Sequence, residues 1–374
     1  MAISKVTTAS ITDADITTAK LAYDAAPFRN IVINGDMSIA QRSTSVSSIT
    51  GSGYNTVDRF RTNMGTAGTW TQSQSTDVPT GQGFATSFKM DCTTANGSLS
   101  AGSFLIIDQR VEGQNLQYLK KGTSSAESTT ISFWVKSAKT GTYIVALNDL
   151  DNSRYIANSY TISSANTWEK KTITYAGDTT GAFDNDNASS LKVQFWLVAG
   201  TTYSSGTLAT SWESNTNANN AVGQVNLADS TSNEWYITGV QLEAGTSASD
   251  FEFLPQDVNL QRCQRYYFVQ CDGSVSAAQD IGIGTYYTST DLRASFSFPT
   301  TMRTTPTLEV ETVTDGYDFR RNGGVDRMDD FVLNNASLTS ASLINNSDVS
   351  GTAGQAGHLF SDDASCFLAV SAEL

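Results

Sequence analysis

The sequence has few of the residues from which catalytic sites and nucleic-acid-binding surfaces are usually built. Among its 374 residues, one is histidine, four are cysteine and five are proline, and only 16% are charged. The formal net charge is −14, which argues against a nucleic-acid partner because binding phosphates requires a positive surface. The acidity also disfavours docking on anionic lipid, so a neutral polysaccharide or a protein partner fits better. The alternative is that the acidity only keeps a large protein soluble.

Cysteines and long apolar runs are too scarce for a disulfide framework or a membrane span. Cys92, Cys263, Cys271 and Cys366 are widely scattered, and we expect free thiols, although Cys263 and Cys271 could pair if neighbouring strands bring them together. No apolar run approaches the roughly 20 residues that cross a bilayer, so we expect no membrane insertion. The opening Met1-Ala-Ile-Ser-Lys lacks an apolar signal-peptide core, which predicts synthesis in a cytoplasm without export.

The residues that are abundant favour an all-β protein. Ser, Thr, Asn and the 28 Gly suit exposed strand faces and tight turns, and 39% hydrophobic residues can fill real cores. From Arg29 to about Pro255 the sequence shows about eleven short strand-like segments separated by turns, beginning with residues 30–34. This pattern predicts a two-sheet sandwich. A short helical connector is predicted over 257–267, and further strand-like segments follow to the end of the chain.

Residues 6–25 form a short repeat of period five, in which one large aliphatic side chain recurs. These aliphatic residues are Val6, Ile11, Ile16 and Leu21. Period five matches neither a helix nor a flat strand, and four copies are too few to bury a core alone. We expect the segment to fold with copies from other chains or against a partner; a flexible polar leader is the alternative.

Four motifs occur in order along the predicted sandwich. They are Asn30-Ile-Val-Ile-Asn-Gly-Asp-Met37, Ser132-Phe-Trp-Val-Lys136, Asn166-Thr-Trp168 and Trp235-Tyr-Ile-Thr-Gly-Val-Gln-Leu-Glu243. Together they resemble the jelly-roll carbohydrate-binding modules found in bacteriophage tail-fibre and other virion-fibre proteins. The later string Cys263-Gln-Arg-Tyr-Tyr267 and the closing Ala369-Val-Ser-Ala-Glu-Leu374 are similar to the same proteins.

The resemblance implies three parts: a virion-attachment and oligomerisation segment (1–28), a jelly-roll carbohydrate-binding-like domain (29–255) and a smaller C-terminal β-sandwich domain (256–374). It implies a homotrimeric phage fibre, most simply a tail fibre, joined to virion tail or neck proteins through its N-terminus. Such a fibre binds a host-surface receptor, a glycan or a protein. A purely structural head or neck fibre, or a decoration protein, is the alternative, and a glycan depolymerase is a third.

Catalytic chemistry finds little support in the sequence. The lone histidine, His358, lies in a predicted Gly-rich loop without a partner for zinc or for a nucleophilic triad. The paired carboxylates needed for glycan cleavage occur only in Gly- or Asn-rich segments where Asp commonly forms turns. We therefore expect no enzymatic activity and no cofactor.

Two kinds of binding residue are predicted. The resemblance implies a structural calcium near the first and last strands of the jelly roll, held by Asn34, Asp36 and Glu243; ordinary turn residues are the alternative. Aromatic rings in polar segments suit stacking on sugars, which makes Trp70, Tyr203 and Trp212 the candidate ligand-binding residues. The tryptophans in apolar strands, at 134, 196 and 235, are expected in the core.

Overall fold

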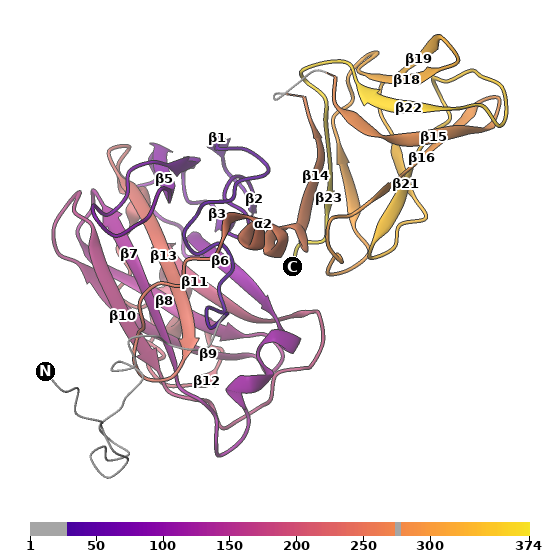
Figure 1. The fold of residues 1–374 in the computed structure, drawn as a ribbon. Coiled ribbons are helices and arrows are strands. Elements are labelled where there is room, and N and C mark those ends of the chain that lie inside the picture. Colours follow the sequence, from indigo (N-terminus) through magenta and orange to yellow (C-terminus); the bar gives the residue numbers. More distant parts are fainter. Residues whose placement is uncertain (1–27, 274–277) are drawn as a thin grey trace, which may run out of the picture. The chain divides into compact units, whose positions relative to one another are not determined.

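The computed structural model describes residues 28–273 and 278–374, and β-strands dominate its regular structure (Figure 1). The predicted all-β class is confirmed. The chain forms two compact units. The first contains the described residues of 28–38, 46–53 and 61–253, and the second contains residues 39–45, 54–60 and the described part of 254–374. Within the described ranges, no helix has the length and hydropathy needed to cross a membrane.

The first unit is a sandwich of two antiparallel sheets (Figure 1). Sheet A runs in the order β1 (Ser45–Ile49), β4 (Thr69–Ser75), β5 (Ser87–Thr94), β13 (Glu234–Ala244), β7 (Thr129–Ser137) and β10 (Glu169–Tyr175). Sheet B runs in the order β12 (Glu213–Ser214), β9 (Arg154–Ile162), β8 (Gly141–Asp149), β11 (Ser189–Ala199), β6 (Phe104–Glu112), β3 (Arg61–Gly65) and β2 (Gly53–Tyr54). Strands far apart in sequence are neighbours, as in the predicted jelly roll.

Side-chain alternation along each strand decides which residues fill the space between the two sheets. In β7, the side chains of Ile131, Phe133 and Val135 are fully buried. The Phe133 ring packs edge-on against Phe195 of β11, with ring centroids 5.2 Å apart, and Phe195 also contacts Trp235. Burying side chains of this size stabilises the fold by roughly 1.5–3 kcal/mol each.

A long polar segment between β11 and β13 folds over the outer face of sheet B. It contains α1 (Thr201–Ser204), β12 and the short 3-10 helices η4 (Asn217–Asn219) and η5 (Leu227–Asp229); two more, η2 (Gly113–Asn115) and η3 (Gln117–Leu119), follow β6. Ala209 and Ala221 of the segment pack against apolar side chains of sheet B. Beneath them the Trp196 Nε1–H donates to the Tyr155 hydroxyl at 2.9 Å. The segment therefore covers the part of this face that Trp196 and Tyr155 occupy.

The second unit has two antiparallel sheets and one helix. The smaller sheet runs β14 (Tyr267–Asp272), β23 (Phe367–Ser371), β17 (Thr307–Val310). The larger runs β19 (Gly324–Met328), β18 (Tyr317–Arg321), β22 (Ala356–Ser361), β15 (Asp280–Thr288), β16 (Asp291–Ser297), β21 (Ser340–Asn345), β20 (Val332–Asn334). The predicted helical connector is confirmed as α2 (Gln256–Gln264). A single core, which includes Phe319, Leu359 and Leu368, joins the two sheets.

Charged groups are buried where residues 39–45 and 54–60 join this second unit. The Arg59 guanidinium, which is fully buried, pairs with Glu373 and lies 3.5 Å from the centroid of the Tyr266 ring. Asp58 accepts hydrogen bonds from the backbone N–H and the side-chain amide of Gln41. Burial is the main cause that raises the pKa of Asp58 to about 6.

Several sequence expectations change at this level. Residues 30–34 do not form a strand. The Ile31 N–H donates to the Leu242 carbonyl of β13, but the neighbouring bonds come from the side chain of Asn30, which donates to the Val240 carbonyl and accepts from the Leu242 N–H. His358 lies in β22 rather than in a loop. The units divide between residues 253 and 254, and residues 39–45 and 54–60 belong to the second unit, which no local pattern predicted. All four cysteines are free and buried, which confirms the expectation of free thiols.

Candidate binding site

The structure removes Trp70 from the candidate sugar-binding residues. Its side chain is fully buried in β4, and its Nε1–H donates to the Ala67 carbonyl at 2.7 Å. A ring inside the core has no face for a ligand, so this prediction is wrong. The polar residues that flank Trp70 in sequence occupy the opposite face of the strand, because successive side chains alternate.

Tyr203 is half-buried and serves the packing of the covering segment. Its ring packs edge-on against Phe104, with centroids 5.6 Å apart, and lies 5.4 Å from the centroid of Trp196. These contacts attach α1 to sheet B.

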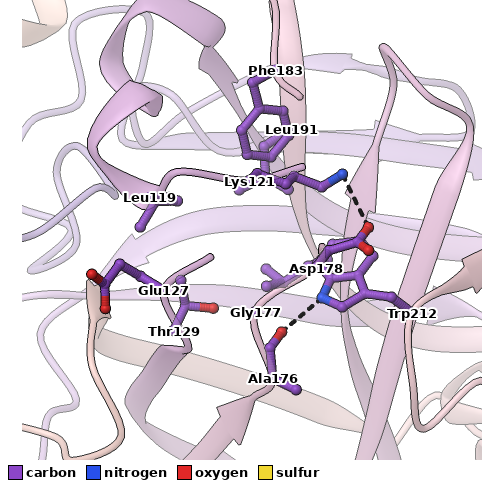
Figure 2. A pocket seen from close by; sticks show the side chains of 11 residues that line it. Leu119, Lys121, Glu127, Thr129, Ala176, Gly177, Asp178, Phe183, Leu191 and Trp212 are labelled. Atoms are coloured by element: carbon purple, nitrogen blue, oxygen red, sulfur yellow. Dashed lines mark hydrogen bonds and ion pairs between the residues drawn. The ribbon is translucent and has the colours of Figure 1, made fainter. Parts of the chain in front are cut away.

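Trp212 lines a small pocket at the edge of the sandwich, which Figure 2 shows. The indole Nε1–H donates to the Ala176 carbonyl at 2.8 Å, and Lys121 Nζ lies 5.3 Å from the centroid of the indole ring system. The apolar walls include Leu119, Phe183 and Leu191. The centre has room for about one water molecule, which is far less than a sugar ring requires.

The polar wall of this pocket is a buried ion network. Lys121 Nζ lies 2.6 Å from the Asp149 carboxylate and 3.0 Å from that of Asp178, and it donates to the carbonyls of Thr180 and Gly181. Burial alone would raise the pKa of Asp178, but hydrogen bonds from Arg154 and Lys121 hold it below its usual value. The network is satisfied from within, so its role is to hold this end of the sandwich together.

The predicted calcium ligands lie along β13 and the segment beside it. The Glu243 carboxylate is already bonded: it accepts from the Ser249 N–H and hydroxyl and from Gln241, and it lies 3.6 Å from Arg29. Asn34 and Asp36 belong to the turn whose Gly35 carbonyl accepts from the Val240 N–H. Among the described residues, no group of three or more His, Cys, Asp or Glu side chains is placed to hold a metal ion.

The predicted attachment residues Val6, Ile11, Ile16 and Leu21 lie outside the described residues. Their role in virion attachment stays a prediction.

A cluster of aromatic and charged side chains lies on the outer face of sheet A. Its central row crosses three strands: Lys89 of β5 pairs in register with Tyr236 of β13, and Tyr236 pairs with Lys136 of β7. Lys136 Nζ lies 4.2 Å from the centroid of the Tyr236 ring. Trp168, just before β10, completes the row and packs edge-on against Tyr236 with centroids 6.2 Å apart. Trp134 of β7 lies on the same face, two residues before Lys136.

Carboxylates hold these rings in place. Asp77 accepts a hydrogen bond from Trp168 Nε1–H at 2.9 Å and pairs with Lys136. Glu234 accepts from the Tyr236 hydroxyl at 2.7 Å and from Lys89 at the same distance. Burial, with the Glu234 hydrogen bond, raises the pKa of Tyr236 to about 12, so this phenol stays protonated. We call these seven residues, Asp77, Lys89, Trp134, Lys136, Trp168, Glu234 and Tyr236, the aromatic patch.

The aromatic patch offers the chemistry that carbohydrate recognition uses. Trp134 and Trp168 are half-buried, so each retains accessible ring surface for the apolar C–H faces of a sugar. The carboxylates of Asp77 and Glu234, with exposed fractions of 45% and 34%, can accept hydrogen bonds from sugar hydroxyls. Because hydrogen bonding and ring packing already hold the Trp168 side chain, ligand binding would cost little side-chain conformational entropy at this residue.

The sequence assigned Trp134 to the core and did not select Trp168. The signal for Trp134 was its alternation: it shares a strand face with Ser132 and Lys136, while Ile131, Phe133 and Val135 share the other. Trp168 could not be found in this way, because its surroundings depend on Asp77 and Tyr236, far away in sequence.

No protein-family model matches the sequence, and no curated protein matches it. Among solved structures, the chain is similar to the enzymatically active domain of tailspike protein 4 of bacteriophage CBA120, at 17% identity over 59% of this chain, with a TM-score of 0.30. It spans 22% of that chain. It is also similar to TmCBM61 in complex with beta-1,4-galactotriose, at 10% identity over 58% of this chain and 99% of that one, with a TM-score of 0.30. A family 11 carbohydrate-binding module of Clostridium thermocellum is similar at 14% identity over 54% of this chain and 99% of that one, with a TM-score of 0.25. Likenesses this partial assign no ligand or activity to the chain.

Proposed function

We propose that this chain is a component of a bacteriophage fibre, most simply a tail fibre, and that its first unit binds a host-surface glycan. In this proposal residues 1–28 attach the chain to the virion, the fibre is a homotrimer, and the chain binds without catalysing a reaction. The ordered sequence motifs and the period-five repeat support the fibre assignment.

One observation carries the glycan proposal: two half-buried tryptophans and a tyrosine share one outer face of sheet A, beside partly exposed carboxylates. Exposed tryptophan surface is costly in water, and a ring held by its own hydrogen bond is suited to a ligand. Trp168 is held in this way by Asp77. Three linked copies would raise a weak individual contact to useful avidity, because bound neighbours keep each site at high effective concentration.

Binding to host cells tests the separate roles proposed for residues 1–28 and for the first unit. A form lacking residues 1–28 should bind host cells as well as the full chain when the two are compared at the same oligomeric state, while only the full chain joins fibre-less particles. Absence of cell binding by both forms would contradict the receptor role and indicate a purely structural fibre or decoration. Release of reducing ends from host polysaccharide would contradict the non-catalytic assignment.

A further inference from the structure

The larger sheet of the second unit (Figure 1) has an apolar outer face. Along β15, Ile283 and Tyr287 alternate with core-facing residues and are 63% and 64% exposed. Val332 of β20 and Val325 of β19, the strands at the two edges of the sheet, are also exposed. Four of the eight exposed large hydrophobic side chains among the described residues therefore lie on this one face. An apolar patch that a protein leaves open usually marks an interaction site.

Strand register connects these side chains across the sheet. Ile283 pairs with Ser295 of β16 on one side and with His358 of β22 on the other. His358 is exposed and pairs next with Arg320 of β18. Arg320 pairs in turn with Val325 of β19. This outward row therefore runs from β16 to one edge of the sheet.

A second outward row runs to the other edge. Val332 pairs with Ile344 of β21, and Ile344 pairs with Arg293 of β16. Arg293 pairs in turn with Thr285 of β15, and its guanidinium lies 4.0 Å from the centroid of the Tyr287 ring. The two rows join the exposed side chains of both edges into one surface. We call the outward surface around the following residues the apolar face: Ile283, Tyr287, Val325, Val332 and Ile344.

The charged side chains of the apolar face balance within the chain. Its outward strand positions hold three arginines and three aspartates: Arg293, Arg320, Arg327, Asp280, Asp291 and Asp318. Each arginine lies near one of these aspartates, at 2.8, 3.1 and 3.6 Å. Asp362, directly after β22, lies 3.4 Å from Arg320. Arg321 and Asp326, on the other face of the sheet, pair with each other. Copies of a chain with a net charge of −14 repel each other over most of their surface, so a nearly neutral face is where they can approach.

The apolar face is large enough for a stable contact between proteins. Its seven strands, about 4.8 Å apart, span about 29 Å, and about six residues of a strand span about 20 Å. The flat area is therefore about 600 Å², and projecting side chains raise the accessible area above this value. An interface of standard size takes about 800 Å² from each partner. The face thus matches one side of such an interface in size.

We propose that copies of this chain associate through the apolar face, each copy presenting the same face to the other. Two sheets pack face to face about 10 Å apart when apolar side chains fill the space between them. A second copy offers a flat, apolar and nearly neutral surface, which is what this face requires of a partner. A nucleic acid or an acidic peptide would find the arginines already paired.

This contact is independent of the segment to which the proposed function gives virion attachment. The proposal names a surface in the described part of the chain and sets no number of copies. A chain that associates in pairs through this face would contradict the proposed homotrimer alone. Association that depends only on residues 1–28 would contradict the present proposal alone.

Analytical ultracentrifugation over a concentration series tests the proposal. The full chain and a form lacking residues 1–28 should both associate as concentration rises. Ile283→Asp places a carboxylate at the centre of the face and should weaken association about tenfold or more, because burial of an isoleucine side chain accounts for a factor of that size. The matched control, Tyr118→Asp, replaces another exposed hydrophobic side chain, in the first unit, and should associate as the wild type does.

A second variant separates lost association from lost folding. Ile283→Thr keeps the β-branched shape that strands favour. It should also weaken association, while the dilute protein keeps the unfolding midpoint of the wild type. Unchanged association in both Ile283 variants would overturn the proposal, as would a wild-type chain that stays monomeric or an equal loss in Tyr118→Asp.

The single histidine of the chain reports on the same face. His358 pairs in register with Ile283, and diethyl pyrocarbonate modifies its imidazole. Modification should be rapid in dilute wild type, slow in the associated protein, and rapid at both concentrations in Ile283→Asp. Slow modification of the dilute monomer would overturn the proposal, because another part of the same chain would then cover the face.

Discussion

Replacing Asp58 with asparagine should change how the stability of the second unit depends on pH. Asp58 is almost fully buried, and its pKa is raised from 3.8 to about 6, chiefly by desolvation and in spite of hydrogen bonds from Gln41 and the charge of Arg42. In the unfolded chain the same carboxyl returns to its ordinary pKa. Between these two values the folded state therefore binds more protons than the unfolded state, and stability falls as pH rises.

The size of the effect follows from the shift. A rise of about two units, at about 1.4 kcal/mol per unit, means that ionised Asp58 destabilises the fold by about 3 kcal/mol above pH 6. The contribution is absent below about pH 3, where the carboxyl is protonated in both states. Asparagine cannot ionise, so the stability difference between Asp58→Asn and wild type should move in favour of the variant by about 3 kcal/mol between pH 3 and pH 7.

Urea unfolding at several pH values, followed by fluorescence, measures this difference. Comparing the two proteins at each pH cancels the titration of every other group. A difference that stays constant from pH 3 to pH 7 would refute the reasoning, and a difference that moves in favour of wild type would reverse its sign. Asp91→Asn, in which the carboxylate replaced is 33% exposed, is the control for the chemical change from aspartate to asparagine.

Two further predictions concern the buried network and the thiols. Lys121→Met should lower the unfolding free energy by about 3–5 kcal/mol, because it leaves the buried carboxylates of Asp149 and Asp178 without their shared cation. Lys120→Met, which breaks an exposed pair, should lower it by at most about 1 kcal/mol. Equal urea midpoints for the two variants would contradict this prediction. All four cysteines are buried, and burial raises the pKa of Cys92 to about 11. The native chain should therefore react with a thiol reagent at neutral pH far more slowly than the denatured chain, in which all four thiols should react. Rapid labelling of the native chain would be inconsistent with the fold.

The fold class could be predicted from the sequence because it depends on local signals. Strand-length segments, turn residues and side-chain alternation each act over a few positions, and they were sufficient for the sandwich and for α2. The prediction of a strand at residues 30–34 was wrong because the side chain of Asn30 makes two bonds to β13 that the backbone would make in a paired strand. Residues 39–45 and 54–60 join the second unit through contacts with positions near 266 and 373, which no local pattern encodes.

The binding residues were predictable only in part. Trp70 and Trp212 have similar polar sequence surroundings, yet Trp70 is fully buried and Trp212 is held beside a buried ion network. The alternation in β7 contained the information that Trp134 faces outward. The partners of Trp168, Asp77 and Tyr236, are distant from it in sequence, so they become visible only once the strands are placed side by side.

Titration of host envelope polysaccharide against the wild type and two tryptophan variants tests the central claim most directly. Trp168→Ala removes a ring of the aromatic patch, while Trp212→Phe alters a partly exposed tryptophan outside it. A central aromatic contact contributes about 2 kcal/mol or more to binding, so Trp168→Ala should weaken binding about thirtyfold, and Trp212→Phe should leave it unchanged. Wild-type affinity in a folded Trp168→Ala chain would contradict the assignment of glycan binding to this face.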